Sequence, residues 1–392
     1  MTNQANVIGV SMVKFEKPGR NEPYEMMASK AITGALADAG ISLSDVQQAY
    51  ASYVYGDSTC GQTALYQVGM TGIPIINVNN NCSSGSTALY MARQAVESGA
   101  SDCVLAFGFE EMKPGALGEH WSDRTSPFQW IYHQFDQLNN DLPDGPVALK
   151  VFGAAGKEYL EKYGVTSDIY GKVAVKSRQH AINNPYSLFT KEIQLDEVMN
   201  SPEVYPGLKR LMACPPTCGA AAVVVCSDQF AKEHNIKKTV KIVAQSMTTD
   251  KPDTYEDNLR LVGYGMTVRA AKEVYEKAGI GPEDVDVVEL HDCFTPNEVI
   301  TYEGLGLCAE GEAEKLINDK DNTYGGKYVI NPSGGLMSKG HPLGATGLAQ
   351  CTELVWHLRG DAGERQVQGA KVALQHNVGL GGACVVTAYQ KA

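Results

Sequence analysis

The sequence has no long hydrophobic run and no run of basic residues. Residues 219–226 form one of its longest apolar stretches, far short of the ~20 residues that cross a bilayer. The 33 Lys and Arg residues are outnumbered by 45 Asp and Glu residues, which leaves a formal charge of −12. A surface of that charge repels a polyanion. We therefore expect a protein that neither inserts into a membrane nor binds nucleic acid.

The sequence also lacks a disulfide framework and a recognisable targeting signal. Its ten cysteines follow no regular spacing, and the closest pair, Cys214 and Cys218, has no second Cys or His pair nearby. This pattern favours free thiols in a reducing compartment and argues against a metal site. A strand is predicted already at residues 7–15, which leaves no room for a signal peptide, and Tyr389–Ala392 is not a peroxisomal address of the Ser-Lys-Leu type. We expect a cytoplasmic protein.

The chain is organised around Cys82, which lies between a predicted strand and a predicted helix. Residues 73–78 are apolar and β-branched, as in a buried strand, and from Ser83 to Gly99 apolar residues recur with the period of a helix. A thiol at a helix start meets unpaired N–H groups and the positive end of the helix dipole, which favour the thiolate. The alternative is a small buried hydrophobe, as most cysteines are. The polar neighbours of Cys82 favour a nucleophile.

Two segments from the first half of the chain recur, in the same order, in the second half. Residues 41–46 match 280–285, where a turn leads into a predicted strand. Residues 81–89 match 340–348, where a predicted helix starts after a loop. A repeat of alternating strands and helices predicts two similar halves, with mostly parallel sheets that helices cover on both faces.

The repeat sets His341 at the position that Cys82 occupies in the first half. If the two halves pack about a pseudo-twofold axis, the two helix starts converge and bring the thiol and the imidazole together. Pro342 then falls in the first helical turn, where its missing N–H costs nothing. The sequence thus predicts a cysteine–histidine pair between the halves.

The repeat divides the chain into four segments, and 392 residues are enough for two or three domain-sized units. The part that fits neither half is rich in Pro, Gly, aromatic and charged residues and carries predicted helices at 147–163 and 167–183. Such an insertion is typical of a lid or a substrate-binding domain. We expect the first half at residues 1–112, the insertion at 113–210, a return to the first half at 211–238 and the second half at 239–392.

Four short motifs lie at or near the predicted loops. They are Asn-Asn-Asn-Cys-Ser-Ser-Gly at 79–85, His-Asp-Cys-Phe at 291–294, Asn-Pro-Ser-Gly-Gly at 331–335 and Gly-His-Pro at 340–342. With these motifs the chain resembles the thiolase superfamily, and more narrowly its sterol carrier protein type, from about residue 7 to residue 389. The resemblance implies an α/β protein with the thiolase fold, in which two repeated βαβαβ halves form a layered α/β/α/β/α core with an inserted, mostly helical and loop domain. It also implies cleavage of a 3-ketoacyl-CoA by a second CoA, or the reverse Claisen condensation.

The resemblance assigns catalytic roles to four residues. Thiolysis needs an attacking thiolate, an acid/base for the departing carbanion and two oxyanion holes. The family pattern gives attack and acylation to Cys82, and proton transfer and thioester binding to His341. Ordinary thiolases take a second, proton-shuttling cysteine from a C-terminal Cys-x-Gly motif. The matching stretch here, residues 375–379, reads Gln-His-Asn-Val-Gly and contains no cysteine. The resemblance implies that Cys293 takes over this acid/base role and that His291 replaces the usual oxyanion-hole Asn.

Further site residues follow from the same resemblance. His376 is expected to line the site, and the backbone at Cys82 and at Gly379 and Gly381 to form the second oxyanion hole. As alternatives, His291 could cap a strand end and His376 could be a core histidine. Three histidines clustered with two cysteines favour a site instead. Contacts to the substrate are expected from Lys172, Arg178, Ser246 and Met337.

The resemblance implies CoA and acyl-CoA as substrates and no permanently bound cofactor. Because CoA carries phosphates and the chain is acidic, we expect a local basic patch, and the helices of the insertion offer one. Each of its residues could equally belong to an ordinary solvated helix face. The patch comprises Lys150, Lys157, Lys162, Lys172, Lys176, Arg178 and Lys191.

Two other functions stay open. Thiolase-like relatives include retro-aldolases that act on CoA esters, but these generally lack the nucleophilic cysteine. A silent lipid- or CoA-binding scaffold would have lost Cys82, Cys293 or His341, and all three are present. Cys218 replaces an Asp of many thiolases, at a position that we expect to be structural. No lipid-transfer domain of the kind fused to animal relatives is expected after Ala392.

An apolar strand is predicted near residues 104–109, with no charge before Glu110 and Glu111. Unprotected sheet edges are usually covered, and thiolases pair theirs across a twofold axis. We therefore expect this strand to be an edge that pairs in a homodimer.

Overall fold

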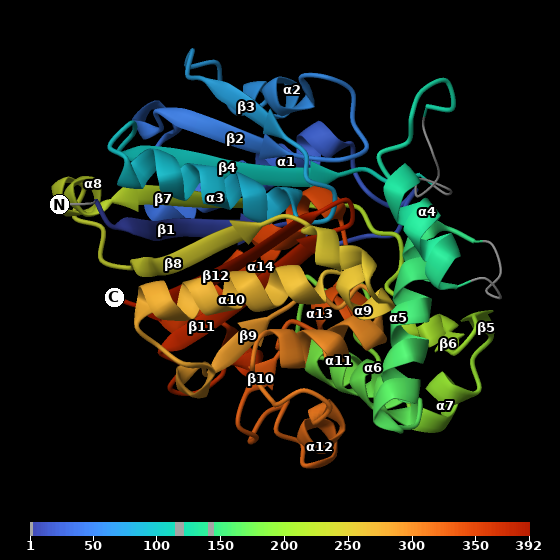
Figure 1. Cartoon of the computed structure of the whole chain (residues 1–392). Helices are drawn as coiled ribbons and strands as arrows, with labels where there is room; N and C mark the ends of the chain where they lie inside the picture. The colour runs from blue at the N-terminus through green and yellow to red at the C-terminus, as the bar shows by residue number, and fades with distance from the viewer. Residues whose placement is uncertain (1–2, 114–120, 140–144) are drawn as a thin grey trace.

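The computed structural model describes residues 3–113, 121–139 and 145–392, and most of its strands belong to one ten-stranded mixed sheet (Figure 1). The strands lie in the order β10-β9-β11-β12-β8-β1-β7-β4-β2-β3. The strands of the first half are β1 (Ala5–Met12), β2 (Gln48–Ser52), β3 (Ile75–Val78), β4 (Cys103–Glu110) and β7 (Gly219–Ser227). Those of the second half are β8 (Val240–Thr248), β9 (Val287–Glu289), β10 (Val329–Ile330), β11 (Val372–Gly379) and β12 (Ala383–Lys391).

The strand order shows the predicted repeat. The sheet divides where β1 meets β8, and on each side five strands follow in equivalent positions, ending at β3 and at β10. The first repeated segment is a one-turn helix in both halves. In each, an Asp carboxylate accepts the N–H three residues before it at 2.8 Å, Asp45 from Ser42 and Asp284 from Gly281. The layered α/β fold is therefore confirmed.

The prediction of mostly parallel sheets is wrong. Of the nine pairings between described strands of the large sheet, five are antiparallel. The parallel pairings join β2 with β3 and β4, and β9 with β10 and β11, and helices lie between these strands in the chain. β12 instead follows β11 directly, and β7 returns to β4 after the insertion, so each pairs antiparallel with the strand along which it returns.

Two helices, α3 (Ser84–Glu97) and α14 (Leu343–Arg359), form the central layer and bury one shared apolar core against both halves of the sheet. They approach closely because glycines face each other at their N-terminal ends. A Cβ on Gly85 would lie 3.0 Å from the Gly344 carbonyl oxygen, and a Cβ on Gly347 would lie 2.3 Å from the Ser86 nitrogen. Gly85 and Gly344 are equivalent in the repeat, so the same repeat position lacks a side chain at both helix starts.

Two further helices cover the outer faces. α1 (Tyr24–Ala39) packs on β1 and β7, and α10 (Tyr264–Ala278) packs on β8 and β12. Both end at a glycine in the left-handed region, Gly40 and Gly279, as helices commonly do. In the described part of the chain, none of the helices is both long and apolar enough to cross a bilayer. The other helices of the two halves are α2 (Cys60–Tyr66), α8 (Asp228–Glu233), α9 (Asn258–Leu261), α11 (Thr295–Gly304), α12 (Ala313–Asn318) and α13 (Gly335–Ser338).

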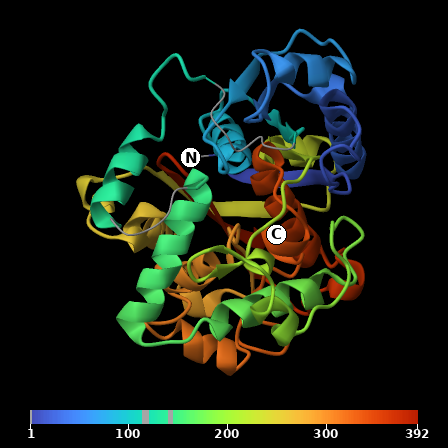
Figure 2. The same cartoon turned by 90° about the vertical axis from the view of Figure 1, so that its right-hand side faces the viewer.

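The insertion packs on the second half and shares its apolar core (Figure 2). The Phe152 ring stacks on Phe294, with centroids 5.1 Å apart, and the Tyr159 hydroxyl donates to the Glu303 carboxylate. Since Phe294 ends the His-Asp-Cys-Phe motif, the insertion covers the predicted site directly. Its elements are α4 (Gln129–Leu138), α5 (Val147–Tyr163), α6 (Asp168–Ala181), α7 (Leu195–Met199) and the small strands β5 (Glu203–Tyr205) and β6 (Leu208–Lys209).

The strand near residues 104–109 is not a sheet edge, contrary to the prediction. β4 lies between β2 and β7 and pairs with both. β7 comes after the insertion and begins more than 100 residues beyond the end of β4. Its pairing with β4 therefore leaves no local signal in the sequence. The edge of the first half is instead β3, which pairs only with β2 among the described strands.

Candidate active site

Cys82 lies in the loop between β3 and α3, immediately before the helix N-cap Ser83. The loop turns back at Asn81, whose φ of 50° lies in the left-handed region that Asn tolerates. Two serine hydroxyls hold it: Ser83 Oγ donates to the Asn80 carbonyl oxygen at 2.8 Å, and Ser84 Oγ accepts the Asn80 N–H at 2.8 Å. The Cys-Ser-Ser sequence therefore builds the loop that presents the thiol.

His341 precedes α14 and presents an unprotonated nitrogen to the site. The Thr346 hydroxyl donates to the Pro342 carbonyl oxygen at 3.0 Å, so its oxygen must accept from His341 Nδ1, which lies 2.7 Å away. A neutral imidazole with its proton on Nδ1 has a lone pair on Nε2. That Nε2 is buried and has no hydrogen-bond partner among the described residues. His341 is thus arranged as a base.

His291 follows β9 and presents the opposite chemistry. Its Nδ1 lies 3.0 Å from the Asn377 amide nitrogen, a donor, so Nδ1 must accept and the ring proton must lie on Nε2. Burial, with His341 and His376 nearby, lowers the pKa of His291 well below its ordinary value and keeps the ring neutral. His291 is thus arranged as a hydrogen-bond donor.

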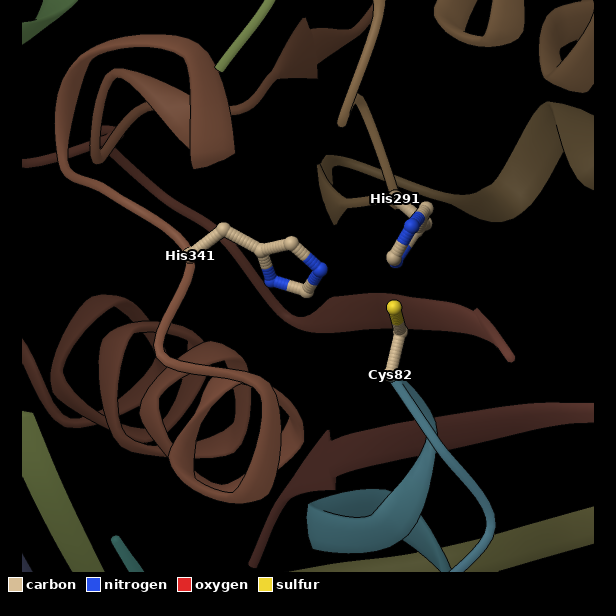
Figure 3. A group of neighbouring side chains, drawn as sticks. All are labelled: Cys82, His291 and His341. Atoms are coloured by element: carbon tan, nitrogen blue, oxygen red, sulfur yellow. The ribbon is translucent and has the colours of Figure 1, made fainter. Parts of the chain in front are cut away.

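The thiol and the two imidazoles converge (Figure 3). One ligand atom from each of Cys82, His291 and His341 lies within 4.8 Å of the other two, and the imidazole rings meet edge to face at 85°. Cysteine and histidine are also metal ligands, but a ligating imidazole must offer a lone pair. His291 Nε2 carries its proton instead, so the hydrogen bonds of this cluster favour acid–base chemistry.

The expected thiolate at Cys82 is not what the structure shows. Burial, and then the nearby Glu110 carboxylate, raise the pKa of Cys82 to about 12. Loss of water around the sulfur disfavours the charged form and so acts against the helix start. Burial also lowers the pKa of His341 to about 3. The resting pair is therefore a neutral thiol beside a neutral imidazole, and the proton must move as the sulfur attacks.

We expect iodoacetamide to alkylate Cys82 slowly at neutral pH and faster with each step towards alkaline pH. Only the thiolate reacts, and below a raised pKa the thiolate fraction grows about tenfold per pH unit. Alkylation rates from peptide mapping between about pH 6 and about pH 10 test this. The unfolded chain provides the control, since its Cys82 has an ordinary pKa. A rate that levels off below about pH 8 would show that the site favours the thiolate after all.

A cavity of about 110 Å³ lies over the Cys82 sulfur. Cys293 and His341 line it, and so does Cys214, which the sequence did not indicate as a site residue. Cys214 lies directly opposite Cys293, because Ala213 and Phe294 form a bridge and the Cys214 N–H donates to the Cys293 carbonyl oxygen at 2.9 Å. The rest of the lining is mostly apolar, with Met112, Phe128, Pro146, Val147, Ala148, Phe152, Phe294, Leu343 and Leu380 among its members.

An outer cavity of about 490 Å³ adjoins the inner one. The two share Tyr55, Asn81, Phe128, Val147 and Leu380, so the outer cavity borders the chamber of the thiol. Segments of the insertion and of the two halves contribute to its wall. The remaining members include Trp121, Arg124, Thr125, Ser126, Pro127, Tyr132 and Gly381.

The turn after β11 lies against the nucleophile loop. A Cβ on Gly379 would lie 2.2 Å from the Asn80 carbonyl oxygen, and the Asn81 amide donates to the Leu380 carbonyl oxygen at 3.1 Å. Gly381, with a φ of 96°, lines the outer cavity. The structure therefore brings this turn to the site, where only glycine fits beside the loop.

His376 does not line either cavity, contrary to expectation. Its Nε2 lies 2.9 Å from the Thr267 hydroxyl, and its Nδ1 accepts the backbone N–H of His291 at 3.4 Å. Both ring nitrogens are occupied, so this histidine supports the backbone of His291 and has no free nitrogen for proton transfer. The alternative of a core histidine describes its position.

Ser246 and Met337, expected as substrate contacts, also line neither cavity. Ser246 is buried in β8 and donates to the Glu273 carboxylate at 2.8 Å. Met337 is buried in α13, where its N–H lies 3.4 Å from a carboxylate oxygen of Asp292.

None of the seven cations of the expected basic patch, Lys191 included, lines either cavity. Lys172 on α6 pairs with Asp168 at 2.7 Å, and the Arg178 guanidinium stacks on Phe189 at 3.9 Å from the ring centroid. Both therefore make contacts within the fold, outside the walls of these two cavities. Lys150 and Lys176 are buried, and Lys176 pairs with the Glu298 carboxylate. These side chains are used within the fold, and Lys157 and Lys162 pair with Glu161 and Glu310.

Two buried side chains, Cys218 and Glu110, hold backbone segments near the site. Cys218 Sγ accepts the Met112 N–H at 3.1 Å, a structural role as expected. Glu110, at the end of β4, accepts N–H groups from Tyr55 at 2.9 Å and from Gly344 at 3.0 Å. Burial raises the pKa of Glu110 to about 7. This carboxylate links the start of α14 to the first half. In the sequence, Glu110 looks only like the charged end of a strand, so its buried role carries no signal there.

Comparison with known proteins finds similarity along nearly the whole chain. A family model for the thiolase N-terminal domain matches residues 6–229, and one described as thiolase C-terminal domain-like matches residues 254–389. Sterol carrier protein 2 from Bos taurus is 55% identical over 397 residues, which cover 100% of this chain and 73% of the relative. An acetyl-CoA acetyltransferase from Methanothermobacter thermautotrophicus is 34% identical and covers 98% of this chain and 99% of its own.

Among solved structures, the Ltp2-ChsH2(DUF35) aldolase superposes with a TM-score of 0.82 at 22% identity, covering 99% of this chain and 98% of its own. At that identity the likeness establishes the fold alone. The family matches span both halves of the repeat, and the cysteine and histidine of the two repeated motifs meet in the structure. The chain belongs to the thiolase family, and within it to the sterol carrier protein type.

Proposed function

We propose that the protein is a 3-ketoacyl-CoA thiolase, an acetyl-CoA C-acyltransferase that works through an acyl-cysteine intermediate. The observation that carries this proposal is the position of the Cys82 thiol between a base and a donor, His341 Nε2 and His291 Nε2–H. An acyltransferase needs both, since the thiol must lose its proton and a carbonyl oxygen must be stabilised as it gains charge.

In the first half-reaction, Cys82 attacks the 3-keto carbon and His341 Nε2 takes the thiol proton. The resulting alkoxide collapses, the bond between C2 and C3 of the substrate breaks, and its electron pair leaves with the acetyl-CoA part as an enolate. His291 Nε2–H and the newly protonated His341 donate to the enolate oxygen. Cys293 gives its thiol proton to C2, which releases acetyl-CoA and leaves Cys293 as a thiolate.

In the second half-reaction, the Cys293 thiolate takes the thiol proton of an incoming CoA. The CoA sulfur attacks the acyl group on Cys82, and the tetrahedral adduct collapses to a shortened acyl-CoA and the Cys82 thiolate. His341 returns its proton to Cys82, which restores the resting state. The turn at Gly379 and Gly381, which contacts the loop of Cys82, is proposed to supply backbone donors for the tetrahedral oxygen.

The outer cavity is the proposed entry of CoA and acyl-CoA, because it shares part of its wall with the chamber of the thiol. Arg124 is the guanidinium that lines it, stacked on Trp121 at 4.8 Å from the ring centroid. Arg124 also pairs with its exposed neighbour Asp123 at 2.8 Å. Unlike Lys172 and Arg178 it lines the cavity, and for that reason we propose it as the phosphate contact. The ten cysteines are all free thiols, which suits a reducing compartment, and we propose the cytoplasm.

A cleavage assay with and without free CoA tests the activity. A thiolase turns over a 3-ketoacyl-CoA only when CoA is present, forming acetyl-CoA together with a shortened acyl-CoA. Without CoA the reaction stops after one acyl group per chain. The likeness to an aldolase structure makes retro-aldol cleavage the second candidate. Its signature is cleavage of a 3-hydroxyacyl-CoA to an aldehyde or ketone without added CoA, and this outcome would replace the proposal.

We expect a homodimer that forms through the open edge of β3. This strand pairs only with β2 among the described strands, and Ile75, Ile76 and Val78 are half-buried along it. Such an edge recruits another strand unless it is covered, and a twofold axis covers two at once. Light scattering at micromolar concentration measures the mass directly, and a monomer would rule out this arrangement.

A further inference from the structure

A chain of buried hydrogen bonds runs from the middle of the molecule to His291. Its members are Gln375 and Asn377 on β11 and Ser86 on α3, and all three are fully buried. We call these three residues the amide relay. Gln375 and Asn377 are two apart on one strand and so face the same side. Ser86 reaches them from the helix of the other half.

The Gln375 amide determines which group donates and which accepts at each hydrogen bond of the relay. Its amide nitrogen donates to the Gly347 carbonyl oxygen at 2.7 Å, and its amide oxygen accepts from the Tyr389 hydroxyl. A carbonyl oxygen can only accept, so the orientation of this amide is unambiguous. The same nitrogen donates to Ser86 Oγ at 2.9 Å.

The direction passes on through Ser86 to Asn377. Since Ser86 Oγ accepts from Gln375, its own proton goes to the Asn377 amide oxygen, 3.0 Å away. That leaves the Asn377 amide nitrogen to face His291 Nδ1 at 3.0 Å. An inverted Asn377 amide would set a second donor against Ser86 Oγ and leave the hydroxyl without its acceptor.

The packing is built to keep the relay in place. Gly347 has no side chain where the relay passes: a Cβ there would lie 2.2 Å from Ser86 Oγ and 2.9 Å from the Asn377 amide oxygen. The backbone of His291 is held independently, since its N–H donates to His376 Nδ1 at 3.4 Å. The relay therefore acts on the ring of His291, and not on the course of its backbone.

We propose that Asn377 is a positioning residue that, through the amide relay, holds the ring proton of His291 on Nε2. In this tautomer His291 donates to an oxyanion, and in the other it would present a lone pair to it. The effect on catalysis rests on the proposed thiolase function, but the tautomer itself does not. Because Ser86 belongs to the first half and Asn377 to the second, the donor is correct only when the two halves are docked.

Nuclear magnetic resonance of protein labelled with ¹⁵N-histidine tests the tautomer without any assay of activity. In the wild type we expect His291 Nδ1 to be unprotonated and Nε2 to carry the proton, with signals assigned through His291→Asn. Asn377→Asp replaces the donor by an acceptor, so Nδ1 should become protonated. Ser86→Ala frees the amide to invert and should give a mixture. A wild-type Nδ1 that carries a proton, or an Asn377→Asp variant in which it stays unprotonated, would overturn the proposal.

Kinetics then separate positioning from general stability. Asn377→Asp should lower condensation of two acetyl-CoA by roughly 10²- to 10³-fold, the usual cost of losing one oxyanion donor, with acetylation of Cys82 by acetyl-CoA little changed. Gln245→Glu is the matched control, a buried amide-to-carboxylate change at a residue that bonds Thr387 at 2.9 Å. Equal loss in both variants, or equal loss of acetylation and condensation in Asn377→Asp, would reduce the relay to a structural role. If the wild type shows no acetylation at all, the thiolase proposal fails while the tautomer measurement still decides the relay.

Discussion

Replacing Cys82 by serine is expected to abolish thiolysis, with a loss of turnover on the order of 10⁴-fold or more and a fold that is unchanged. The thiol sits beside an unprotonated His341 Nε2 that can take its proton during attack. Burial already raises the pKa of this thiol to about 12, so proton transfer from Cys82 to His341 is already unfavourable in the wild type. An alcohol has a much higher pKa still and is a poorer nucleophile. The measurement is the steady-state rate of 3-ketoacyl-CoA cleavage.

A second cysteine variant separates a specific loss from a general one. Cys308→Ser changes another half-buried free cysteine, at a position outside both cavities. It should keep the wild-type rate within a few-fold. Turnover of Cys82→Ser at that same level would remove Cys82 from the role of nucleophile.

Cys293→Ala is expected to preserve acetylation of Cys82 and to lose most of the condensation activity. Acetylation of Cys82 by acetyl-CoA should fall by less than about tenfold, since a thiolate leaves without first gaining a proton. Condensation of two acetyl-CoA should fall by roughly 10²- to 10⁴-fold, because a carbon acid needs a positioned base. Cys293 is buried in the cavity wall, and burial raises the pKa of its thiol, which suits a group that holds a proton at rest.

The matched control is Cys214→Ala, which removes the thiol directly opposite Cys293 in the same cavity. It should leave condensation within about tenfold of wild type, so that only Cys293 carries the acid/base step. If Cys293→Ala condenses acetyl-CoA normally, the assignment from the His-Asp-Cys-Phe motif is wrong. If Cys214→Ala shows the larger loss, the two thiols exchange roles.

The repeat predicted the meeting of Cys82 and His341, because two matched helix starts locate one axis of symmetry. The match extends to Gly85 and Gly344, which allow the two helices to approach. It could not predict the pKa of the thiol. The helix-start argument uses only local sequence, whereas burial depends on residues far along the chain, among them Phe152 and Leu380 in the cavity wall.

The strand order was beyond the sequence for a related reason. Alternating strands and helices describe β2, β3 and β4 correctly, but β7 joins β4 only after the whole insertion. Pairings of that length carry no local signal, so β4 looked like an edge. Likewise, charge alone does not tell a phosphate contact from a side chain that pairs within the fold, as Lys172 does with Asp168.

The amide relay did leave a signal in the sequence. Gln375, His376 and Asn377 are three consecutive polar residues inside a strand that is otherwise apolar, and all of them are buried. Buried polar groups must find partners, so such a run predicts a buried network even when its members cannot be paired. Cys214 left no comparable signal, because nothing in its surroundings distinguishes it from the other free cysteines.

The most direct test of the account is mass spectrometry of the protein after it is mixed with a 3-ketoacyl-CoA in the absence of free CoA. The account predicts one acyl group per chain, located by peptide mapping on Cys82, together with one equivalent of acetyl-CoA. Addition of CoA should then remove the acyl group and return the thiol. An unmodified Cys82 in a protein that still cleaves its substrate would contradict the acyl-cysteine intermediate, and with it the proposed thiolase mechanism.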